Sequence, residues 1–236
     1  MKLAIMQPYF FPYVGYFSLM VYADRFISFD TAQYISHGWI NRNRILSSKG
    51  EPIYMSVPIK KASRDTAIKD IEIDKSQKWV DKILGQLTAY KRKAPYYKET
   101  IEIITEILSS NETDSLSQLN MHILMKLASY LEIECEFDVF FEMNLKIETV
   151  DEPDEWALNI SKALGAEEYV NPPGGIEFFN KRKYDDAHIE LKFLQSGLKP
   201  YIQRIGRWEP GLSIVDVMMF CDRNEIMDIL NEYSFL

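Results

Sequence analysis

Residues 2–30 read KLAIMQPYFFPYVGYFSLMVYADRFISFD, and this stretch decides the fold. Residues 2–6 form a short apolar run that is typical of a buried parallel strand. Two prolines within residues 7–12 prevent the strand from continuing, and from Tyr13 onward apolar side chains recur at helical spacing. Residues 25–29 form a second apolar run. Two strands joined by a helix form a βαβ crossover, which predicts a parallel sheet.

The rest of the chain continues as strands and helices on either side of a helical stretch. Apolar runs predict strands at residues 52–59, 68–73, 134–141, 169–171 and 189–194. Helical spacing predicts three helices within residues 76–132 and further helical segments at residues 155–164, 176–180, 212–220 and 225–233. Residues 31–50 show no sustained period and indicate a long polar and aromatic loop. We therefore expect one compact α/β domain, with a Rossmann-like parallel sheet in residues 1–75 and 133–236 and a helical insertion at residues 76–132.

Composition excludes several classes of protein. The 236 residues include 27 Lys and Arg against 35 Asp and Glu, and a net charge of -8 repels nucleic acid. No apolar run is long enough to span a membrane. Cys135 and Cys221 lie among apolar residues and indicate reduced thiols in a cytoplasmic protein. His37, His122 and His188 are far apart in sequence, so no metal site is predicted.

The loop after the first strand is the strongest candidate for a binding site. Ligands of open α/β sheets bind at the carboxyl ends of strands, where free backbone N–H groups and the helix dipole favour anions. Gly15 allows a ligand close to the backbone, and Tyr13 and Tyr16 share one face of the first helical turn. Gln7 and Tyr9 belong to the same loop. The alternative interpretation is that these aromatic residues pack in the core beneath a turn.

The segment Tyr13-Val14-Gly15-Tyr16 is similar in position to the His-x-Gly-His signature of the HIGH-motif nucleotidylyltransferase superfamily. The imidazoles of that signature hold a triphosphate during adenylyl transfer. Tyrosine hydroxyls donate hydrogen bonds to phosphate but carry no positive charge near neutral pH. The resemblance implies a Rossmann-like fold. It also implies adenylyl transfer as an alternative activity, with ATP and Mg²⁺ as the cofactor.

A second resemblance extends over nearly the whole chain. It rests on segments that occur in order: residues 6–17, 30–34 and 38–44, then Tyr90 with Ala94-Pro95, Tyr169-Val170-Asn171 with Gly174-Gly175, and residues 212–216. In these segments the chain resembles the WbqC-like family. That family is associated with gene clusters for O-antigen and other surface polysaccharides. The resemblance implies an enzyme that modifies an activated amino sugar, for example by N-acylation with an amino acid.

Residues 39–44 add a local basic cluster to an acidic protein. Arg42 and Arg44 offer planar donors suited to phosphate or carboxylate, and Trp39 and Asn41 lie beside them. The alternative interpretation is that both arginines pair with the abundant surface carboxylates.

Other strand ends supply weaker candidates. Asn171 precedes a turn in which Gly174 and Gly175 can present N–H groups to a phosphate, although paired glycines also simply form turns. Asp30 closes the second strand and is either a site residue or a turn cap. His37 has a suitable pKa for a general base, but a structural role in its loop is the alternative.

These candidates predict one cleft at the carboxyl edge of the sheet. We assign catalytic roles to His37, Asp30 and Tyr16, and substrate or nucleotide binding to Gln7, Tyr9, Tyr13, Gly15, Trp39, Asn41, Arg42, Arg44, Asn171, Gly174 and Gly175. The leading hypothesis is a transferase of surface-polysaccharide biosynthesis that acts on a nucleotide-activated or phosphorylated sugar. The alternatives are an ATP-dependent nucleotidylyl or ligase-type transferase and a non-catalytic sugar-nucleotide-binding partner. The absence of a recognisable acid–base pair favours the last of these.

Overall fold

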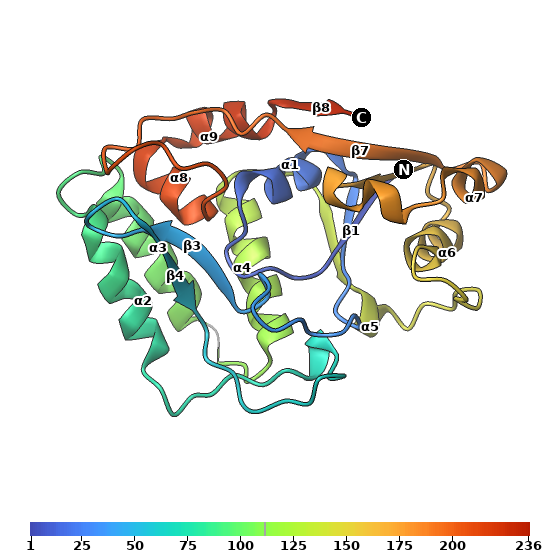
Figure 1. The fold of residues 1–236 in the computed structure, drawn as a ribbon, viewed down its shortest axis with the longest axis horizontal. Coiled ribbons are helices and arrows are strands. Elements are labelled where there is room, and N and C mark those ends of the chain that lie inside the picture. Colours follow the sequence, from blue (N-terminus) through green and yellow to red (C-terminus); the bar gives the residue numbers. More distant parts are fainter. Residues whose placement is uncertain (111) are drawn as a thin grey trace.

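The strand–helix–strand unit at the start of the chain lies at the centre of the sheet. The computed structural model describes residues 1–110 and 112–236 (Figure 1). In it, β1 (Lys2–Met6) and β2 (Arg25–Ser28) are parallel neighbours connected by α1 (Val14–Tyr22). Leu3 pairs with Arg25 in this register. The predicted βαβ crossover is therefore confirmed.

The other strands extend the sheet on both sides of this unit. Its order is β5-β2-β1-β6-β7-β8, and the added strands are β5 (Glu136–Val139), β6 (Glu168–Asn171), β7 (Glu190–Ser196) and β8 (Tyr233–Phe235). The pairings are parallel except for β8, which is antiparallel to β7. The predicted Rossmann-like parallel sheet is confirmed. The predicted helix at residues 225–233 extends too far, because α9 (Arg223–Leu230) ends and the chain turns back into β8.

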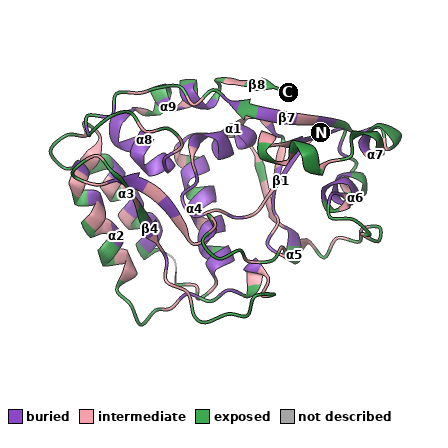
Figure 2. Ribbon diagram, in the orientation of Figure 1, coloured by how far each residue is buried: buried purple, intermediate pink, exposed green. Residues whose placement is uncertain are grey.

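Helices cover both faces of the sheet, and alternate residues of each strand face opposite sides. Ala4 of β1 packs in the larger core, together with α1, α4 (Leu116–Tyr130), α8 (Ile214–Phe220) and α9. Leu3 and Ile5 pack in the smaller core, against α6 (Glu155–Leu164) and α7 (Lys181–Asp186). Figure 2 shows buried residues in β1, α1, α4 and α8.

The predicted helical stretch at residues 76–132 contains three α-helices, as expected. These are α2 (Trp79–Leu87), α3 (Tyr97–Ser109) and α4, and a short η2 (Thr88–Tyr90) follows α2. Ser115 caps α4, because its hydroxyl accepts a hydrogen bond from the backbone N–H of Gln118 at 3.3 Å. Apolar residues of all three helices belong to the same core as Ala4. None of the helices in the described part of the chain has the length and apolar composition needed to cross a bilayer.

Two predictions in the first third of the chain are wrong. The expected loop at residues 31–50 contains β3 (Arg42–Leu46), which pairs with β4 (Pro52–Ser56) in a separate antiparallel sheet. One of the inward positions of β3 is Asn43, so polar residues hide the alternation of the strand. The expected strand at residues 68–73 is instead the 3₁₀ turn η1 (Ile68–Asp70). Ile68 and Ile71 lie one such turn apart, and both are buried.

Short elements around the sheet edge also differ from expectation. The segment predicted at residues 176–180 is a 3₁₀ helix, η3 (Pro173–Phe178). The strand predicted at residues 134–141 stops at Val139 and continues as α5 (Phe140–Met143).

A buried carboxylate joins α8 to two other parts of the chain. Asp216 is fully buried and accepts hydrogen bonds from the Tyr90 hydroxyl at 2.5 Å, the Tyr201 hydroxyl at 2.5 Å and the Gln203 amide at 2.8 Å. The Tyr90 hydroxyl in turn accepts the Leu46 N–H of β3 at 2.7 Å. Tyr90 therefore links β3 to α8 through one oxygen atom.

Replacing Tyr90 by phenylalanine leaves the buried Leu46 N–H and one oxygen of Asp216 without partners. We expect Tyr90→Phe to lower the free energy of unfolding by about 2–4 kcal/mol in urea denaturation, because each orphaned group costs about 1–3 kcal/mol. Tyr54→Phe is the control, since the Tyr54 side chain is exposed and its hydroxyl makes no hydrogen bond within the described residues. Equal stability of the two variants would contradict the linking role of Tyr90.

Candidate functional site

The proline-containing loop between β1 and α1 is held by side-chain amides from distant segments. Asn43 of β3 donates to the carbonyls of Phe10 and Phe11 at 3.1 and 2.9 Å. Asn120 of α4 donates to the carbonyl of Pro8 at 2.8 Å and to that of Ile40 at 2.7 Å. Both asparagines are buried. Each one therefore satisfies two carbonyls that water does not reach.

A hydroxyl and a backbone amide complete this support. Ser213, the N-cap of α8, donates to the carbonyl of Phe11 at 2.7 Å. The Phe10 N–H donates to the carbonyl of Trp39 at 3.0 Å. Phe11 has a φ of 41°, a region that residues other than glycine seldom adopt. The surrounding contacts therefore hold the loop in an unusual conformation.

Two adjoining cavities lie at the carboxyl edge of the sheet beside this loop. We call them the large compartment, of about 710 Å³, and the small compartment, of about 350 Å³, and together they form the sheet-edge cleft. The large compartment is lined by Ile5, Met6, Gln7, Tyr9, Phe29, Thr31, Ala32, Gln33, Pro153, Trp156, Ala157, Tyr169, Asn171, Gly175, Phe178 and Phe179. The small compartment is lined by Met6, Tyr9, Tyr13, Trp39, Asn43, Pro172 and Gly211. Met6 and Tyr9 line both.

The cleft brings together parts of all three predicted segments. Gln7 and Tyr9 from the first loop meet Asn171 and Gly175 from the turn after β6 in the large compartment. Tyr9 meets Trp39 in the small compartment. This is the carboxyl edge of parallel strands, where open α/β sheets bind ligands.

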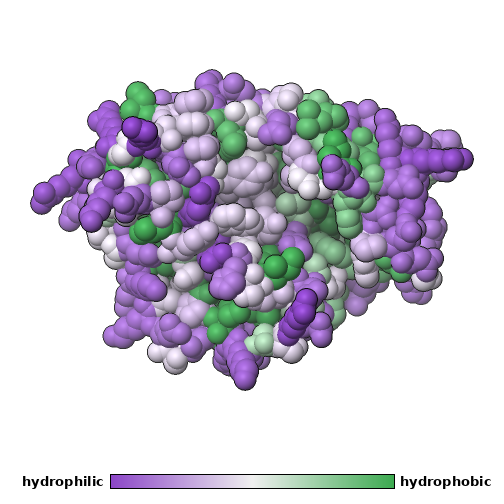
Figure 3. All heavy atoms as spheres, in the orientation of Figure 1, coloured by the Kyte–Doolittle hydropathy of each residue, from purple (hydrophilic) through white to green (hydrophobic). Residues whose placement is uncertain are grey.

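The lining of the cleft is aromatic and uncharged. None of the described residues that line either compartment is Asp, Glu, Lys, Arg or His. Trp156 of α6 and Phe178 of η3 are partly exposed, at 37% and 53%, and form a wall of the large compartment. Figure 3 shows one face of the molecule, with a hollow near its middle and hydrophobic residues on the floor of that hollow. Such a surface suits the apolar faces of a ligand ring.

Several polar groups in the cleft have no partner within the described residues. The hydroxyls of Tyr9 and Tyr13 and the carboxamide of Gln7 make no hydrogen bond to residues 1–110 or 112–236. Burial raises the pKa of both tyrosine hydroxyls, so both are protonated donors at neutral pH. These groups can therefore bind a neutral, hydroxyl-rich ligand.

Gly15 and Tyr16 support the cleft without lining it. A Cβ atom at Gly15 would lie 2.5 Å from the Tyr13 ring, so this glycine makes room for the ring. Tyr16 is fully buried, and its hydroxyl donates to the Gln7 carbonyl at 2.8 Å. Burial raises the pKa of Tyr16 well above its usual value. The hydroxyls of Tyr13 and Tyr16 therefore do not face the same cavity.

Arg44 and Asn41 are occupied by contacts within the chain. Arg44 forms an ion pair with Glu209 at 3.0 Å and donates to the Gly211 carbonyl at 3.4 Å. Asn41 accepts from the Tyr34 hydroxyl and donates to the Val57 carbonyl, both at 3.0 Å. Neither residue lines the cleft.

Arg42 lines neither compartment, but the Tyr54 ring links it to Trp39 of the small compartment. Its guanidinium carbon is 4.2 Å from the centre of the Tyr54 ring, and Tyr54 contacts the ring of Trp39. Its guanidinium donates to the carbonyls of His37 and Gly38 and forms no ion pair within the described residues.

His37 itself is exposed and has a φ of 64°. Its side chain lines neither compartment.

Asp30 lies in a different cavity, on the other side of the end of β2. That cavity has a volume of about 720 Å³ and is also lined by Lys69, His122 and Glu142. Asp30 is 3% exposed and accepts the Phe141 N–H at 3.2 Å. Burial raises the pKa of its carboxyl. The structure therefore separates Asp30 from the sheet-edge cleft.

The turn after β6 contributes backbone and one amide to the cleft. Asn171 donates to the Tyr169 hydroxyl at 2.9 Å, which leaves its carbonyl oxygen without a partner within the described residues. A Cβ atom at Gly175 would lie 3.1 Å from the Phe179 ring, so this glycine allows the aromatic wall to approach. Gly174 has no neighbour that a Cβ would meet and does not line the cleft.

Sequence reasoning missed four aromatic residues of the large compartment. Phe29, Trp156, Phe178 and Phe179 line the large compartment but are spread over three segments. The one available signal was the pair Phe178-Phe179, which follows the Pro-Pro-Gly-Gly turn after two intervening residues. No periodic pattern joins that pair to Trp156.

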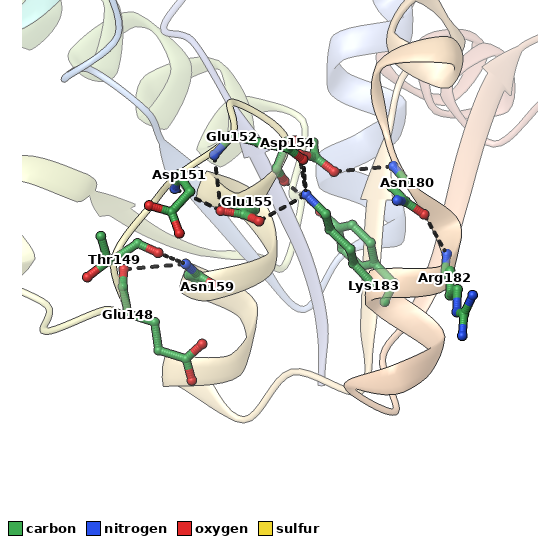
Figure 4. A network of polar contacts seen from close by, with 11 residues as sticks. Glu148, Thr149, Asp151, Glu152, Asp154, Glu155, Asn159, Asn180, Arg182 and Lys183 are labelled. Atoms are coloured by element: carbon green, nitrogen blue, oxygen red, sulfur yellow. Dashed lines mark hydrogen bonds and ion pairs between the residues drawn. The ribbon is translucent and has the colours of Figure 1, made fainter.

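An ion-pair network links the start of α6, which carries Trp156, to α7. The Lys183 ammonium of α7 contacts the carboxylates of Glu152, Asp154 and Glu155 at 2.5, 3.0 and 2.9 Å (Figure 4). The same Glu155 carboxylate accepts the backbone N–H groups of Asp151 and Glu152. These contacts hold the start of α6, and with it Trp156, against α7.

The family model for the WbqC-like protein family matches residues 7–228. The uncharacterized protein Rv1507c of Mycobacterium tuberculosis (strain ATCC 25618 / H37Rv) is 29% identical over 219 residues, which cover 92% of each chain. No solved structure matches the chain.

Among the described residues, no three His, Cys, Asp or Glu side chains are grouped so as to hold a metal ion.

The loop beside the cleft depends on Asn120. We expect Asn120→Ala to lower the free energy of unfolding by about 2–4 kcal/mol, because two buried carbonyls lose their donor. Asn231→Ala is the matched control, since Asn231 is exposed and also donates to a carbonyl, that of Met227, at 2.8 Å. The control should lose less than about 1 kcal/mol in the same urea titration. A smaller loss in Asn120→Ala than in the control would refute this dependence.

The stability that the Lys183–Glu155 contacts give to the wall of the large compartment should depend on pH. The hydrogen bond from Lys183 and the two backbone amides lower the pKa of Glu155 from 4.5 to about 2. The stabilising contribution is therefore complete above the unfolded value of 4.5 and is lost as the pH falls toward 2. Urea unfolding between about pH 5 and pH 2 should show a steeper loss of stability in the native protein than in Glu155→Gln. Parallel curves would show that the network does not stabilise the fold.

Proposed function

The chain belongs to the WbqC-like protein family, and from this premise we propose that it binds and modifies an activated sugar in surface-polysaccharide assembly. The substrate class is a nucleotide-activated or phosphorylated sugar, whose sugar part occupies the sheet-edge cleft. The activity is that of a transferase. N-acylation of an amino sugar is the specific reaction that the family resemblance suggests.

The lining of the sheet-edge cleft is the observation that carries this proposal. A pyranose ring has apolar C–H faces and a rim of hydroxyl groups. Aromatic rings such as those of Tyr9 and Trp156 pack against the faces, while unpaired neutral groups such as the Gln7 carboxamide bind the hydroxyls. A cleft lined by aromatic rings and neutral donors therefore supports sugar binding better than binding of a bare phosphate.

The phosphate of such a substrate belongs at the rim of the small compartment. The lining itself offers no cation to balance a phosphate. Arg42 lies over Tyr54, next to Trp39, and forms no ion pair within the described residues. Charge-assisted hydrogen bonds from a guanidinium are well suited to phosphate oxygens. We therefore assign the phosphate contact to Arg42 and not to Arg44, which already pairs with Glu209.

A non-catalytic sugar-binding partner is the second candidate. It is favoured by the lining, which holds no Asp, Glu, Lys, Arg or His side chain among the described residues. Burial moves the pKa of Tyr9 and Tyr13 further above neutral pH, whereas general acid–base catalysis works best with a pKa near the working pH. The adenylyl-transfer alternative has less support. Its two tyrosines would have to face one triphosphate, whereas Tyr13 lines the cleft and Tyr16 is buried.

Calorimetric titration with UDP-N-acetylglucosamine and with free N-acetylglucosamine tests the proposal. We expect Arg42→Ala to weaken binding of the nucleotide sugar by at least about tenfold, because a charged hydrogen bond worth about 1.5 kcal/mol or more is lost. Binding of the free sugar should change little. Arg92→Ala, an exposed arginine that lines neither compartment, is the control.

A turnover assay alongside the titration distinguishes the candidates. Release of a transfer product on addition of acyl donors supports the transferase, and tight binding without turnover supports the partner protein. If neither ligand binds, or if Arg42→Ala and Arg92→Ala bind the nucleotide sugar equally well, the proposed phosphate contact is wrong.

A further inference from the structure

Tyr9 separates two places in the cleft where a ring can lie. It lines the large compartment on one side and the small compartment on the other, together with Met6. The small compartment alone, at about 350 Å³, is within the range of about 300–1,000 Å³ that is usual for ligand pockets. A single sugar ring in that compartment therefore leaves the large one empty.

Each compartment has its own aromatic surface. Trp39, which is 38% exposed, lines only the small compartment. Trp156, which is 37% exposed, lines only the large compartment. Partly exposed tryptophans facing a cavity present ring area that the fold does not use. The two surfaces belong to different elements, so the cleft offers two separate stacking places and not one extended wall.

The passage between the compartments is as uncharged as the compartments themselves. A diphosphate that joined a nucleoside on one side of Tyr9 to a sugar on the other would place two negative charges among Met6, Tyr9 and their neighbours, with no cation in the lining. Desolvation of unpaired charges makes that arrangement costly. A glycosidic bond is neutral and carries no such cost.

From this we infer that the cleft binds a saccharide of at least two linked sugars, with one ring in each compartment on either side of Tyr9. The inference rests on the proposed function, because it takes sugar binding in this cleft as given. The Tyr54 ring links Arg42 to Trp39 of the small compartment, so the phosphate-bearing sugar is assigned to that compartment and the second sugar to the large one. A glycosyl transfer that joins the two sugars must therefore precede the step in which this protein takes part.

An array of matched mono- and disaccharides tests the inference with the full chain. Each disaccharide should be retained about tenfold more strongly than either of its component sugars, because its second ring buries apolar C–H groups against a second aromatic surface. Trp39→Ala and Trp156→Ala should each reduce disaccharide binding to the level of a monosaccharide. Trp39→Leu and Trp156→Leu retain apolar volume without the ring and should behave in the same way.

Trp208→Ala is the matched control for these variants. Trp208 is 39% exposed, as the other two tryptophans are, but it lines neither compartment, so disaccharide binding should be unchanged. Equal binding of mono- and disaccharides, with one of the two cleft tryptophans dispensable, would overturn the two-ring inference and leave sugar binding intact. Retention of no saccharide of either length would overturn the proposed function as well.

Discussion

Buried carbonyl groups without local partners are the constraint on which the site depends. The loop after β1 contains two prolines, which have no N–H to donate, and it lies beneath other segments instead of on the surface. Asn43, Asn120 and Ser213 donate to its carbonyls from β3, from α4 and from the N-terminus of α8. The same bonds fix Tyr9 and Tyr13 at the sheet edge. The geometry of the cleft thus follows from satisfying this backbone.

Local patterns in the sequence predicted most of the fold. Apolar runs and helical spacing identified the parallel strands and the helices, because burial in these elements repeats over short distances. The elements that were missed have non-local causes. β3 is a strand because β4 pairs with it, although Asn43 occupies a core position. β8 forms at the free edge of β7 after a helix that, from its sequence, was expected to continue.

The meeting of three segments in one cleft was predictable, because strand ends of a parallel sheet share an edge. The partners of individual side chains were not. Arg44 pairs with Glu209, which is 165 residues away, whereas Arg42 lies over the Tyr54 ring and forms no ion pair within the described residues. The cleft is neutral where a cationic lining was expected. The catalytic roles of His37, Asp30 and Tyr16 stay predictions, and none of the three side chains lines the cleft.

The two sides of the cleft are fastened by different kinds of bond. Neutral hydrogen bonds from Asn43 and Asn120 fix the loop that carries Tyr9, and both asparagines are shielded from solvent. The wall that carries Trp156 is fastened by Lys183 to carboxylates, of which that of Glu152 is 66% exposed. Dissolved ions screen the exposed Lys183–Glu152 pair most, screen the pairs with the more buried Asp154 and Glu155 less, and leave the neutral hydrogen bonds nearly untouched. A rise in ionic strength therefore weakens the attachment of the wall that carries Trp156, while the loop that carries Tyr9 keeps its position.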